Sequence, residues 1–231
     1  MLRRALRGLA FAGLLGVAAS VAAVLTLRWV DPPFTSVMLL QPGPVDALEH
    51  IWVPREAIAR DVARAVIAAE DQRFAGHHGI DFESLNQALA DYRDGEGLRG
   101  ASTITQQVAK NLFLWQGRSM TRKVLEAAFA VLIELCWSKE RILEVYLNIA
   151  EFGPGIFGVE AAARRHFGSN AALLGLPQAA LLAAVLPNPQ RLDASAPSAF
   201  VRERQNAIVA QVRLLEMRGH YRGIDWSGAA P

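Results

Sequence analysis

Glu70 is a carboxylate on an otherwise apolar stripe of a predicted helix. It follows Val62 and Val66 at four-residue intervals and precedes Phe74 by four, so these side chains share one helical face. On an interior face, burial disfavours the ionised form of a carboxyl and raises its pKa toward neutrality, as a general base working near pH 7 requires. The alternative is that Glu70 lies at the edge of the stripe and pairs with a local arginine such as Arg73. Glu70 is the first candidate catalytic residue.

A second carboxylate, Glu126, follows Arg122 by four residues and Lys123 by three. Beside two cations Glu126 is expected to stay ionised, unlike a buried Glu70. A pair of carboxylates in different environments is typical of enzymes that act on glycosidic bonds. The two glutamates therefore predict sugar chemistry.

The stretch 97–125 is basic and contains no acidic residue. Its cations are Arg99, Lys110, Arg118, Arg122 and Lys123. Within it, Gly100 and the hydroxyl residues Ser102, Thr103 and Thr105 lead into a predicted helix N-terminus, where unpaired amides and the helix dipole attract anions. A phosphate-bearing ligand is indicated. The alternative is that the hydroxyl residues only cap the helix, since Thr103 and Gln106 have capping-box spacing, while the cations lie on a solvated face. The spacing matches neither a P-loop nor a G-x-S-x-G nucleophile elbow.

Metal and thiol chemistry have little support. His77 and His78 are adjacent but lack a second helical histidine or carboxylate pair, so a hydrogen-bonded structural role for His77 is the better interpretation. Asp71 falls off the apolar stripe and is expected to be a supporting or capping group. The only cysteine, Cys136, excludes an intrachain disulfide and a cysteine metal cage, and it is interpreted as a small core residue.

The elements that must position these residues are helices. The 231 residues are 52% hydrophobic and 20% charged, which suits one domain plus an appendage and excludes a large multidomain enzyme or a disordered chain. A net charge of +2 gives no support for a nucleic-acid partner. Beyond Pro54 the apolar residues recur at three- and four-residue spacing, without sustained alternation, so the fold class is mostly α. Helices are predicted at 58–74, 82–94, 103–112, 122–137, 139–149, 156–167, 177–186 and 199–218; the last is interpreted as packing only.

The amino terminus predicts a membrane anchor. Residues 9–27 carry no charge and follow Arg3, Arg4 and Arg7. At ~1.5 Å per residue this run spans about 28 Å, close to the hydrocarbon thickness of a bilayer. The preceding arginines favour a cytoplasmic N-terminus and an exported domain. A cleaved signal peptide is the alternative, although its apolar region is usually shorter.

Four motifs, taken together and in order, resemble those of the monofunctional biosynthetic peptidoglycan glycosyltransferases, whose domain also forms the N-terminal half of bifunctional penicillin-binding proteins. They are residues 70–79 (EDQRFAGHHG), 100–107 (GASTITQQ), 122–126 (RKVLE) and 139–148 (KERILEVYLN). Matching segments extend from about Trp52 to Pro189. His166 departs from the family pattern, which usually has an aromatic residue before Phe-Gly.

The resemblance implies a lysozyme-like, all-α glycosyltransferase domain preceded by one transmembrane helix. The expected division is a cytoplasmic tail at 1–8, a transmembrane anchor at 9–29, a linker at 30–51, the glycosyltransferase domain at 52–220 and a C-terminal tail at 221–231. Such enzymes polymerise lipid II into β-1,4-linked glycan strands, with inversion at the anomeric carbon and release of undecaprenyl pyrophosphate.

The resemblance also assigns roles. Glu70 is the base that takes a proton from the acceptor, and Glu126 lies near the departing pyrophosphate, where it orients cations or holds a divalent metal, Mg²⁺ or Mn²⁺. Lys110 and Arg118 match phosphate-binding positions. The other expected substrate-binding residues are Arg73, Phe74, Ser102, Gln106, Gln107, Arg122 and Lys123.

The implied setting is the bacterial inner membrane, crossed once, with a periplasmic catalytic domain that works in cell-wall biogenesis. Expected partners are lipid II, the growing glycan chain, membrane lipid and other cell-wall synthesis proteins. There are two alternative hypotheses about function. One is a peptidoglycan-cleaving hydrolase or lytic transglycosylase of lysozyme-like fold, and the other is a membrane-tethered scaffold without activity.

Overall fold

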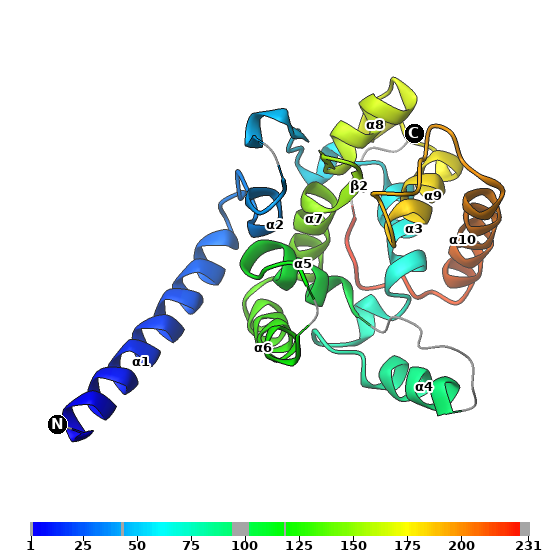
Figure 1. Ribbon diagram of the computed structural model, residues 1–231. Helices are drawn as coiled ribbons and strands as arrows, with labels where there is room; N and C mark the ends of the chain where they lie inside the picture. The colour runs from blue at the N-terminus through cyan, green and yellow to red at the C-terminus, as the bar shows by residue number, and fades with distance from the viewer. Residues whose placement is uncertain (1, 43, 94–101, 118, 227–231) are drawn as a thin grey trace.

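The computed structural model describes residues 2–42, 44–93, 102–117 and 119–226. A long N-terminal helix projects from a body of packed helices (Figure 1). The helices are α1 (Leu2–Leu27), α2 (Ser36–Leu39), α3 (Arg60–Glu70), α4 (Phe82–Arg93), α5 (Ile104–Phe113), α6 (Met120–Cys136), α7 (Lys139–Ile149), α8 (Val159–Phe167), α9 (Leu176–Val185) and α10 (Ala199–Met217). The mostly α prediction is confirmed.

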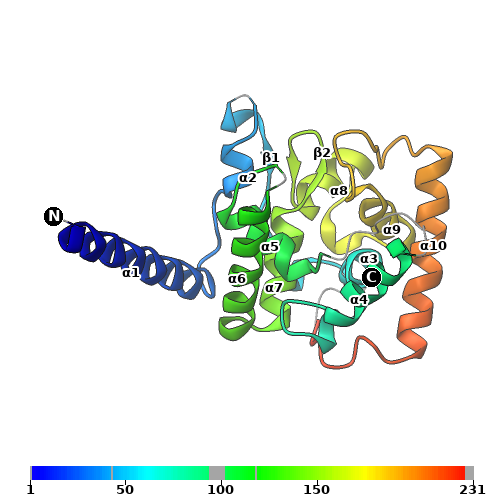
Figure 2. The same ribbon diagram turned by 60° about the horizontal axis from the view of Figure 1, so that its bottom comes forward.

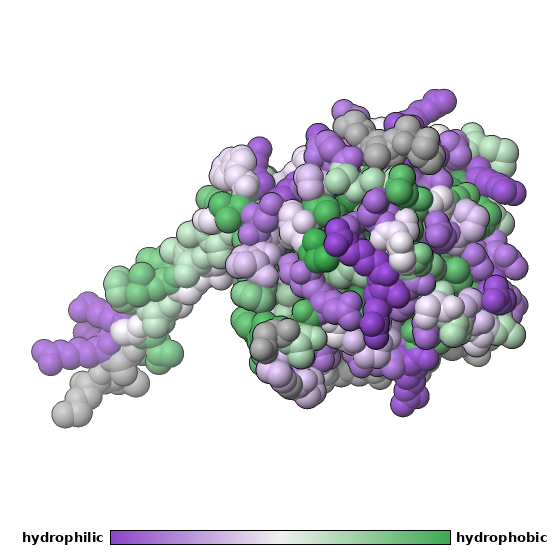
Figure 3. Space-filling view, turned by 90° about the horizontal axis from the view of Figure 1, so that it is seen from above, coloured by the Kyte–Doolittle hydropathy of each residue, from purple (hydrophilic) through white to green (hydrophobic). Residues whose placement is uncertain are grey.

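Helix α1 is long and apolar enough to cross a membrane from Leu6 to Leu27, and few of its side chains are buried. Figure 3 shows its apolar surface outside the body, with hydrophilic side chains at its N-terminal end. Its last turns contact the body: Val24 is buried, and Trp137 Nε1 donates a hydrogen bond to Val24 O at 2.8 Å. The helix fits the predicted membrane anchor.

The segment 30–51, expected to be a linker, contains short folded elements. Thr35 caps α2, whose Met38 is buried in the core. Ser36 Oγ donates to Asn111 O at 3.0 Å, so α2 packs on α5. Further on, β1 (Glu49–His50) joins a sheet. This segment belongs to the folded domain because its apolar side chains have a core to enter.

A small sheet was not predicted. It has the order β1-β3-β2, with β3 (Ile156–Phe157) parallel to β1 and antiparallel to β2 (Glu151–Gly153). The helix expected to start at residue 156 starts at Val159 instead, after Gly158 at a φ of 84°. Strands of two or three residues are too short to show an alternating pattern.

Two groups of helices meet at the site. Helix α3 packs against α9 and α10, while α5 packs between α6 and α7, and Figures 1 and 2 show these neighbours from two sides. The helix predicted at 58–74 ends early, at Glu70, and a short 3-10 turn follows at Phe74–Gly76. The predicted capping box of α5 is confirmed: Thr103 Oγ1 accepts from Gln106 N, and Gln106 Oε1 accepts from Thr103 N. The last residue of α3 is thereby brought beside α5.

Candidate active site

Glu70 is the last residue of α3 and its side chain is only 14% exposed. Gln107 Nε2 donates to Glu70 Oε2 at 2.8 Å, and Arg204 Nη2 lies 3.9 Å from Glu70 Oε1. Burial raises the pKa of Glu70, against the opposing effects of the Gln107 hydrogen bond and the positive charge of Arg204. The inward orientation is confirmed. Arg73, the local partner considered from the sequence, pairs with Glu83 and Asp81 instead.

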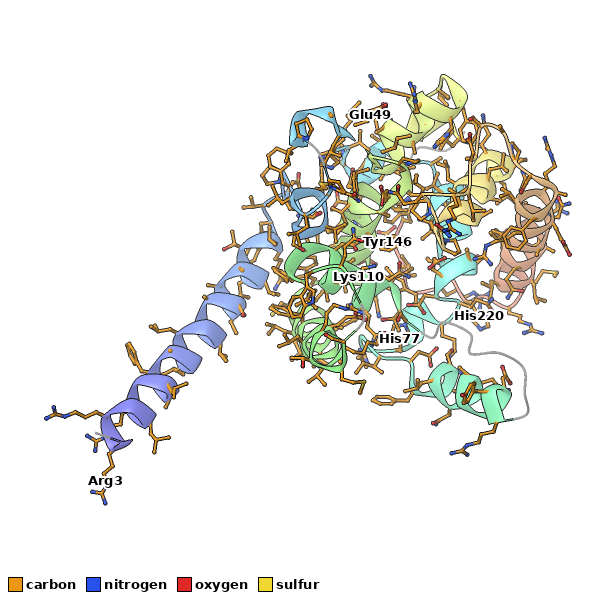
Figure 4. The ribbon with its side chains drawn as sticks, in the orientation of Figure 1. Arg3, Glu49, His77, Lys110, Tyr146 and His220 are labelled. Atoms are coloured by element: carbon orange, nitrogen blue, oxygen red, sulfur yellow. The ribbon has the colours of Figure 1, made fainter. Side chains whose placement is uncertain are left out.

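Tyr146 positions Gln107, the residue that donates a hydrogen bond to Glu70. Its hydroxyl donates to Gln107 Oε1 at 3.1 Å, from α7 to the neighbouring α5. Complete burial raises the pKa of Tyr146 well above its usual value, and the nearby carboxylates of Glu70 and Asp71 act in the same direction. The phenol therefore remains a donor. Figure 4 labels Tyr146 and Lys110 on these two helices in the centre of the body.

Glu126 is buried beside two cations, Arg122 and Lys123. Its side chain is 4% exposed, and its two oxygens accept from Arg122 Nη1 and Lys123 Nζ, each at 2.5 Å. Lys123 Nζ also donates to Ser102 Oγ at 2.8 Å. Glu126 therefore holds both cations, and Lys123 also reaches Ser102.

The negative charges of both Glu70 and Glu126 act on Lys110. Burial lowers its pKa, the negative charge of Glu126 opposes that effect, and the charges of Arg122 and Lys123 reinforce it. The carboxylate of Glu70 also favours the charged lysine. Lys110 follows Gln107 by about one helical turn, so α5 carries both the residue that contacts Glu70 and a lysine close enough to Glu126, Arg122 and Lys123 to respond to their charges.

A cleft of about 930 Å³ opens beside Glu70. Its lining includes Glu70, Arg73, Ser102, Gln107, Pro187 and Arg204. Lys110, Arg122, Lys123 and Glu126 are not part of this lining. Lys123 contacts the cleft wall through its hydrogen bond to Ser102, so the cations lie next to the cleft that Glu70 lines.

A buried network holds α5 against the end of α3. His77 Nε2 lies 2.9 Å from both carboxylate oxygens of Asp71, and Asp71 Oδ2 accepts from the backbone N–H of Ile104 at 3.0 Å. Thr103 Oγ1 donates to Gly79 O at 2.7 Å. The supporting role of Asp71 and the structural role of His77 are confirmed.

These contacts also correct the anion site expected at the start of α5. Asp71 takes the N–H of Ile104 and Thr103 takes that of Gln106, so these donors are not open to a ligand. The hydroxyl of Thr105 donates to Glu134 Oε1 at 2.6 Å. Protein groups therefore take these donors of the helix N-terminus, and the capping interpretation of the hydroxyl residues holds for Thr103.

Two expected substrate-binding residues, Phe74 and Gln106, do not line the cleft. Phe74 is fully buried, with Lys139 Nζ 4.5 Å from its ring centroid, so it packs in the core and does not reach the cleft. Gln106 is buried with its Oε1 in the capping box. Both residues were predicted from their positions in the motifs, but they support the site instead of lining it. Arg99 and Arg118 lie outside the described residues.

Some site residues gave no signal in the sequence. Arg204 comes from α10, more than 130 positions from Glu70, on a helix interpreted only as packing. Glu134 is a lone charge in an apolar helix, and its Oε1 accepts from Lys139 Nζ at 2.7 Å. Tyr146 lies within the fourth matched motif, so its position was marked although its role was not.

The described residues do not fit a divalent cation held by the protein alone. Among them, no group of three or more His, Cys, Asp or Glu side chains is placed to hold a metal. Both oxygens of Glu126 are already bound to cations. The expected role of Glu126 as a metal ligand stays a prediction.

A helical domain with a buried carboxylate on a cleft, and with cations that contact the cleft wall, fits a glycosyl-transferring enzyme class. The family model for transglycosylases matches residues 39–213, and the chain belongs to this family. Proteins named biosynthetic peptidoglycan transglycosylase are similar over most of their length. One from Pseudomonas putida (strain W619) is 53% identical over 222 residues, 93% of this chain and 94% of the relative. One from Shewanella oneidensis is 50% identical over 201 residues, 85% of this chain and 86% of the relative. The family resemblance is confirmed, and the chain is a glycosyltransferase.

Proposed function

We propose that this enzyme is a peptidoglycan transglycosylase that polymerises lipid II into β-1,4-linked glycan strands and releases undecaprenyl pyrophosphate. The single observation that carries the proposal is that the buried Glu70 lines a cleft whose wall residue Ser102 accepts a hydrogen bond from Lys123, one of the cations bound to Glu126. The names and high identity of the relatives support the same substrate class.

In the proposed reaction Glu70 is the general base. Its carboxylate takes the proton from the 4-hydroxyl of the acceptor sugar as that oxygen attacks the anomeric carbon of the donor. A new C–O bond forms with inversion, the bond from the anomeric carbon to the diphosphate oxygen breaks, and the bond's electron pair leaves with the diphosphate. A raised pKa makes Glu70 a stronger base than an ordinary glutamate.

The cations stabilise the charge that develops on the leaving group. Lys110, Arg122 and Lys123 are proposed to contact the diphosphate oxygens, with Arg118 as a further donor by motif position. Glu126 orients Arg122 and Lys123 through the two contacts described above. Cations that are already in place favour the transition state over the ground state.

We place the enzyme in the bacterial inner membrane, with α1 as a single-pass anchor and the domain in the periplasm. The charges of Arg3, Arg4 and Arg7 before the apolar run support this orientation. Exposed apolar side chains on α6, including Met120 and Leu135, support contact with membrane lipid. Contacts with other cell-wall synthesis proteins stay a prediction.

The test compares the full-length chain and Glu70→Gln on purified lipid II in vesicles. Wild type is expected to make long glycan, and the variant to lose about 10² to 10⁴ in rate, as expected for a missing general base. Glu203→Gln on the exposed side of α10 is the matched control. Release of fragments from finished peptidoglycan without polymerisation would favour a lytic enzyme, and full activity of Glu70→Gln would exclude the proposed base.

A further inference from the structure

The guanidinium of Arg204 lies at the Glu70 end of the cleft. Both side chains line the cleft, and Arg204 Nη2 is 3.9 Å from Glu70 Oε1. Among the described residues this is the one carboxylate within ion-pair distance of Arg204, whereas Arg73 in the same cleft is paired with both Asp81 and Glu83. Arg204 therefore acts on Glu70 in particular.

The two oxygens of Glu70 differ. Oε2 accepts a hydrogen bond from Gln107, while no hydrogen bond to Oε1 forms within the part of the chain that the structure describes. At 3.9 Å, Arg204 is too far to occupy a lone pair of Oε1 but close enough to favour its negative charge. Oε1 thus remains open to accept a proton.

Helix α10 fixes Arg204 in this position. Val201 and Ile208, one turn before and one turn after it, are buried against the core. Two turns on, Gln211 Nε2 donates to Gln72 Oε1 at 2.8 Å, which ties the same helix to the segment after Glu70. The Nε atom of Arg204 is buried without a hydrogen-bond partner in the described structure. Buried side-chain donors in folded proteins usually have a partner, so this N–H is an exception.

We propose that Arg204 is a positioning residue for the reaction, which keeps the Glu70 carboxylate ionised and directs its Oε1 into the cleft. This inference rests on the proposed role of Glu70 as the base. It gives the C-terminal helix a function beyond packing.

The groups around Glu70 show what Arg204 must balance. Burial and the charge of Asp71 raise the pKa of Glu70, whereas the hydrogen bond from Gln107 and the charges of Arg204 and Lys110 lower it. Tyr146, on α7, is uncharged and reaches Glu70 only through Gln107. Removing Arg204 leaves burial less opposed, so protonation of Glu70 extends to higher pH.

The test is the pH dependence of kcat for the full-length enzyme on lipid II, compared among wild type, Arg204→Gln, Arg204→Lys and Arg202→Gln. Arg202 is an exposed residue of the same helix and controls for the lost charge. The acidic limb of Arg204→Gln is expected to move up by about 1 pH unit, at the low end for an opposite charge within 4–6 Å because Arg204 is partly exposed. Arg204→Lys is expected to restore most of that shift, and Arg202→Gln to match wild type.

An acidic limb that stays in place in folded Arg204→Gln would overturn the inference, and so would an equal shift in Arg202→Gln. If Arg204→Gln does not fold, Arg204→Met retains more of the apolar stem and provides the same comparison. Glu70→Gln, assayed beside them, separates the two proposals. Its inactivity together with an unshifted Arg204→Gln rejects only the role of Arg204, whereas its full activity rejects the base itself.

Discussion

The hydroxyl of Tyr146 donates to Gln107 Oε1, and this fixes which end of the Gln107 amide faces Glu70. An amide whose oxygen is bound by a phenol must present its NH₂ group to the carboxylate, and Nε2 does donate to Glu70 Oε2. If the amide turned over, its oxygen would face a carboxylate oxygen, and the repulsion would favour a protonated Glu70. The buried Tyr146 on α7 therefore influences the protonation state of Glu70 at the end of α3.

Tyr146→Phe is expected to slow the reaction by about tenfold and lower the free energy of unfolding by about 1 kcal/mol, the effects of one lost buried hydrogen bond. The buried oxygen of Gln107 loses its donor, and the amide becomes free to turn. Lipid II polymerisation and thermal unfolding measure the two effects. Tyr92→Phe, at an exposed position on α4, is the control. A variant with wild-type rate and stability would contradict this role of the phenol.

A site residue could be predicted from the sequence where the residue pattern of its own helix marks it. Glu70 was identified by its place on an apolar stripe, and the Thr103 and Gln106 capping box by its three-residue spacing. Both depend on contacts within one helix. The helix end at Glu70 was placed four residues too late, because the buried Phe74 continues the apolar spacing although the backbone has left the helix.

Contacts between distant segments gave no such signal. Arg204 approaches Glu70 only because α10 packs along α3, and Glu151 receives Gln190 Nε2 at 2.6 Å from the segment after α9. The hydrogen bond from Asp71 to Ile104 N, which closes part of the expected anion site, also joins two segments. Spacing along one helix contains no information about these pairs, so they required the three-dimensional structure.

Glu70→Gln is expected to stabilise the protein at pH 8 while it removes activity. Because the folded state raises the pKa of Glu70 above its ordinary value of 4.5, the fold favours the protonated form, and wild type loses stability as the pH rises through the folded-state pKa. Glutamine is always neutral and avoids that loss, a gain of about 1 kcal/mol by comparison with other relieved active-site residues.

Thermal unfolding of Glu70→Gln and wild type at pH 8 and pH 4 checks this prediction. The difference is expected to shrink at pH 4, where wild-type Glu70 is also protonated. Glu203→Gln, at an exposed position, should show no such trend. A glutamine variant that is less stable than wild type at pH 8 would show that Glu70 is stabilised as an anion.

Removal of divalent metal is expected to reduce the rate of wild type by less than about tenfold, equivalent to 1.4 kcal/mol of transition-state stabilisation. The positive charge of Arg122 and Lys123 is already held at Glu126, and the described residues form no metal cluster. The measurement is lipid II polymerisation after dialysis against EDTA, with Mg²⁺ or Mn²⁺ added back. A loss of more than a hundredfold that either metal restores would establish a metal requirement and return Glu126 to the role of ligand.

Lys110 is expected to set an alkaline limb in the pH profile. Burial lowers its pKa from 10.5, so the lysine loses its charge, and its attraction for phosphate, at a lower pH than an exposed lysine does. Lys110→Arg should move this limb to higher pH, because a guanidinium stays charged above pH 12. Lys110→Met should lower the rate by about 10² to 10³ at neutral pH, as for other preorganised charges. An alkaline limb unmoved in Lys110→Arg would assign it to another group.

Arg141 is expected to hold the end of α1 to the catalytic domain. Its guanidinium donates to Leu27 O at 3.0 Å and to Val30 O at 3.1 Å, and it pairs with Asp31 at 2.8 Å. Leu27 is the last residue of α1, and its carbonyl is among the unpaired acceptors that any helix leaves at its C-terminus, so Arg141 stabilises the last turn and its orientation toward α7.

In Arg141→Gln the amides of Arg28 and Val30, which bond within that turn, should exchange with solvent faster, by about tenfold for each 1.4 kcal/mol of local stability lost. Hydrogen exchange followed by mass spectrometry measures this, with the exposed Arg213→Gln as control. Since a loosened joint lets the cleft tilt relative to a bilayer, polymerisation should fall more in vesicles than in detergent, where no membrane plane orients the substrate. Equal rates of exchange in variant and wild type would mean that Trp137, through its bond to Val24 O, holds the joint without Arg141.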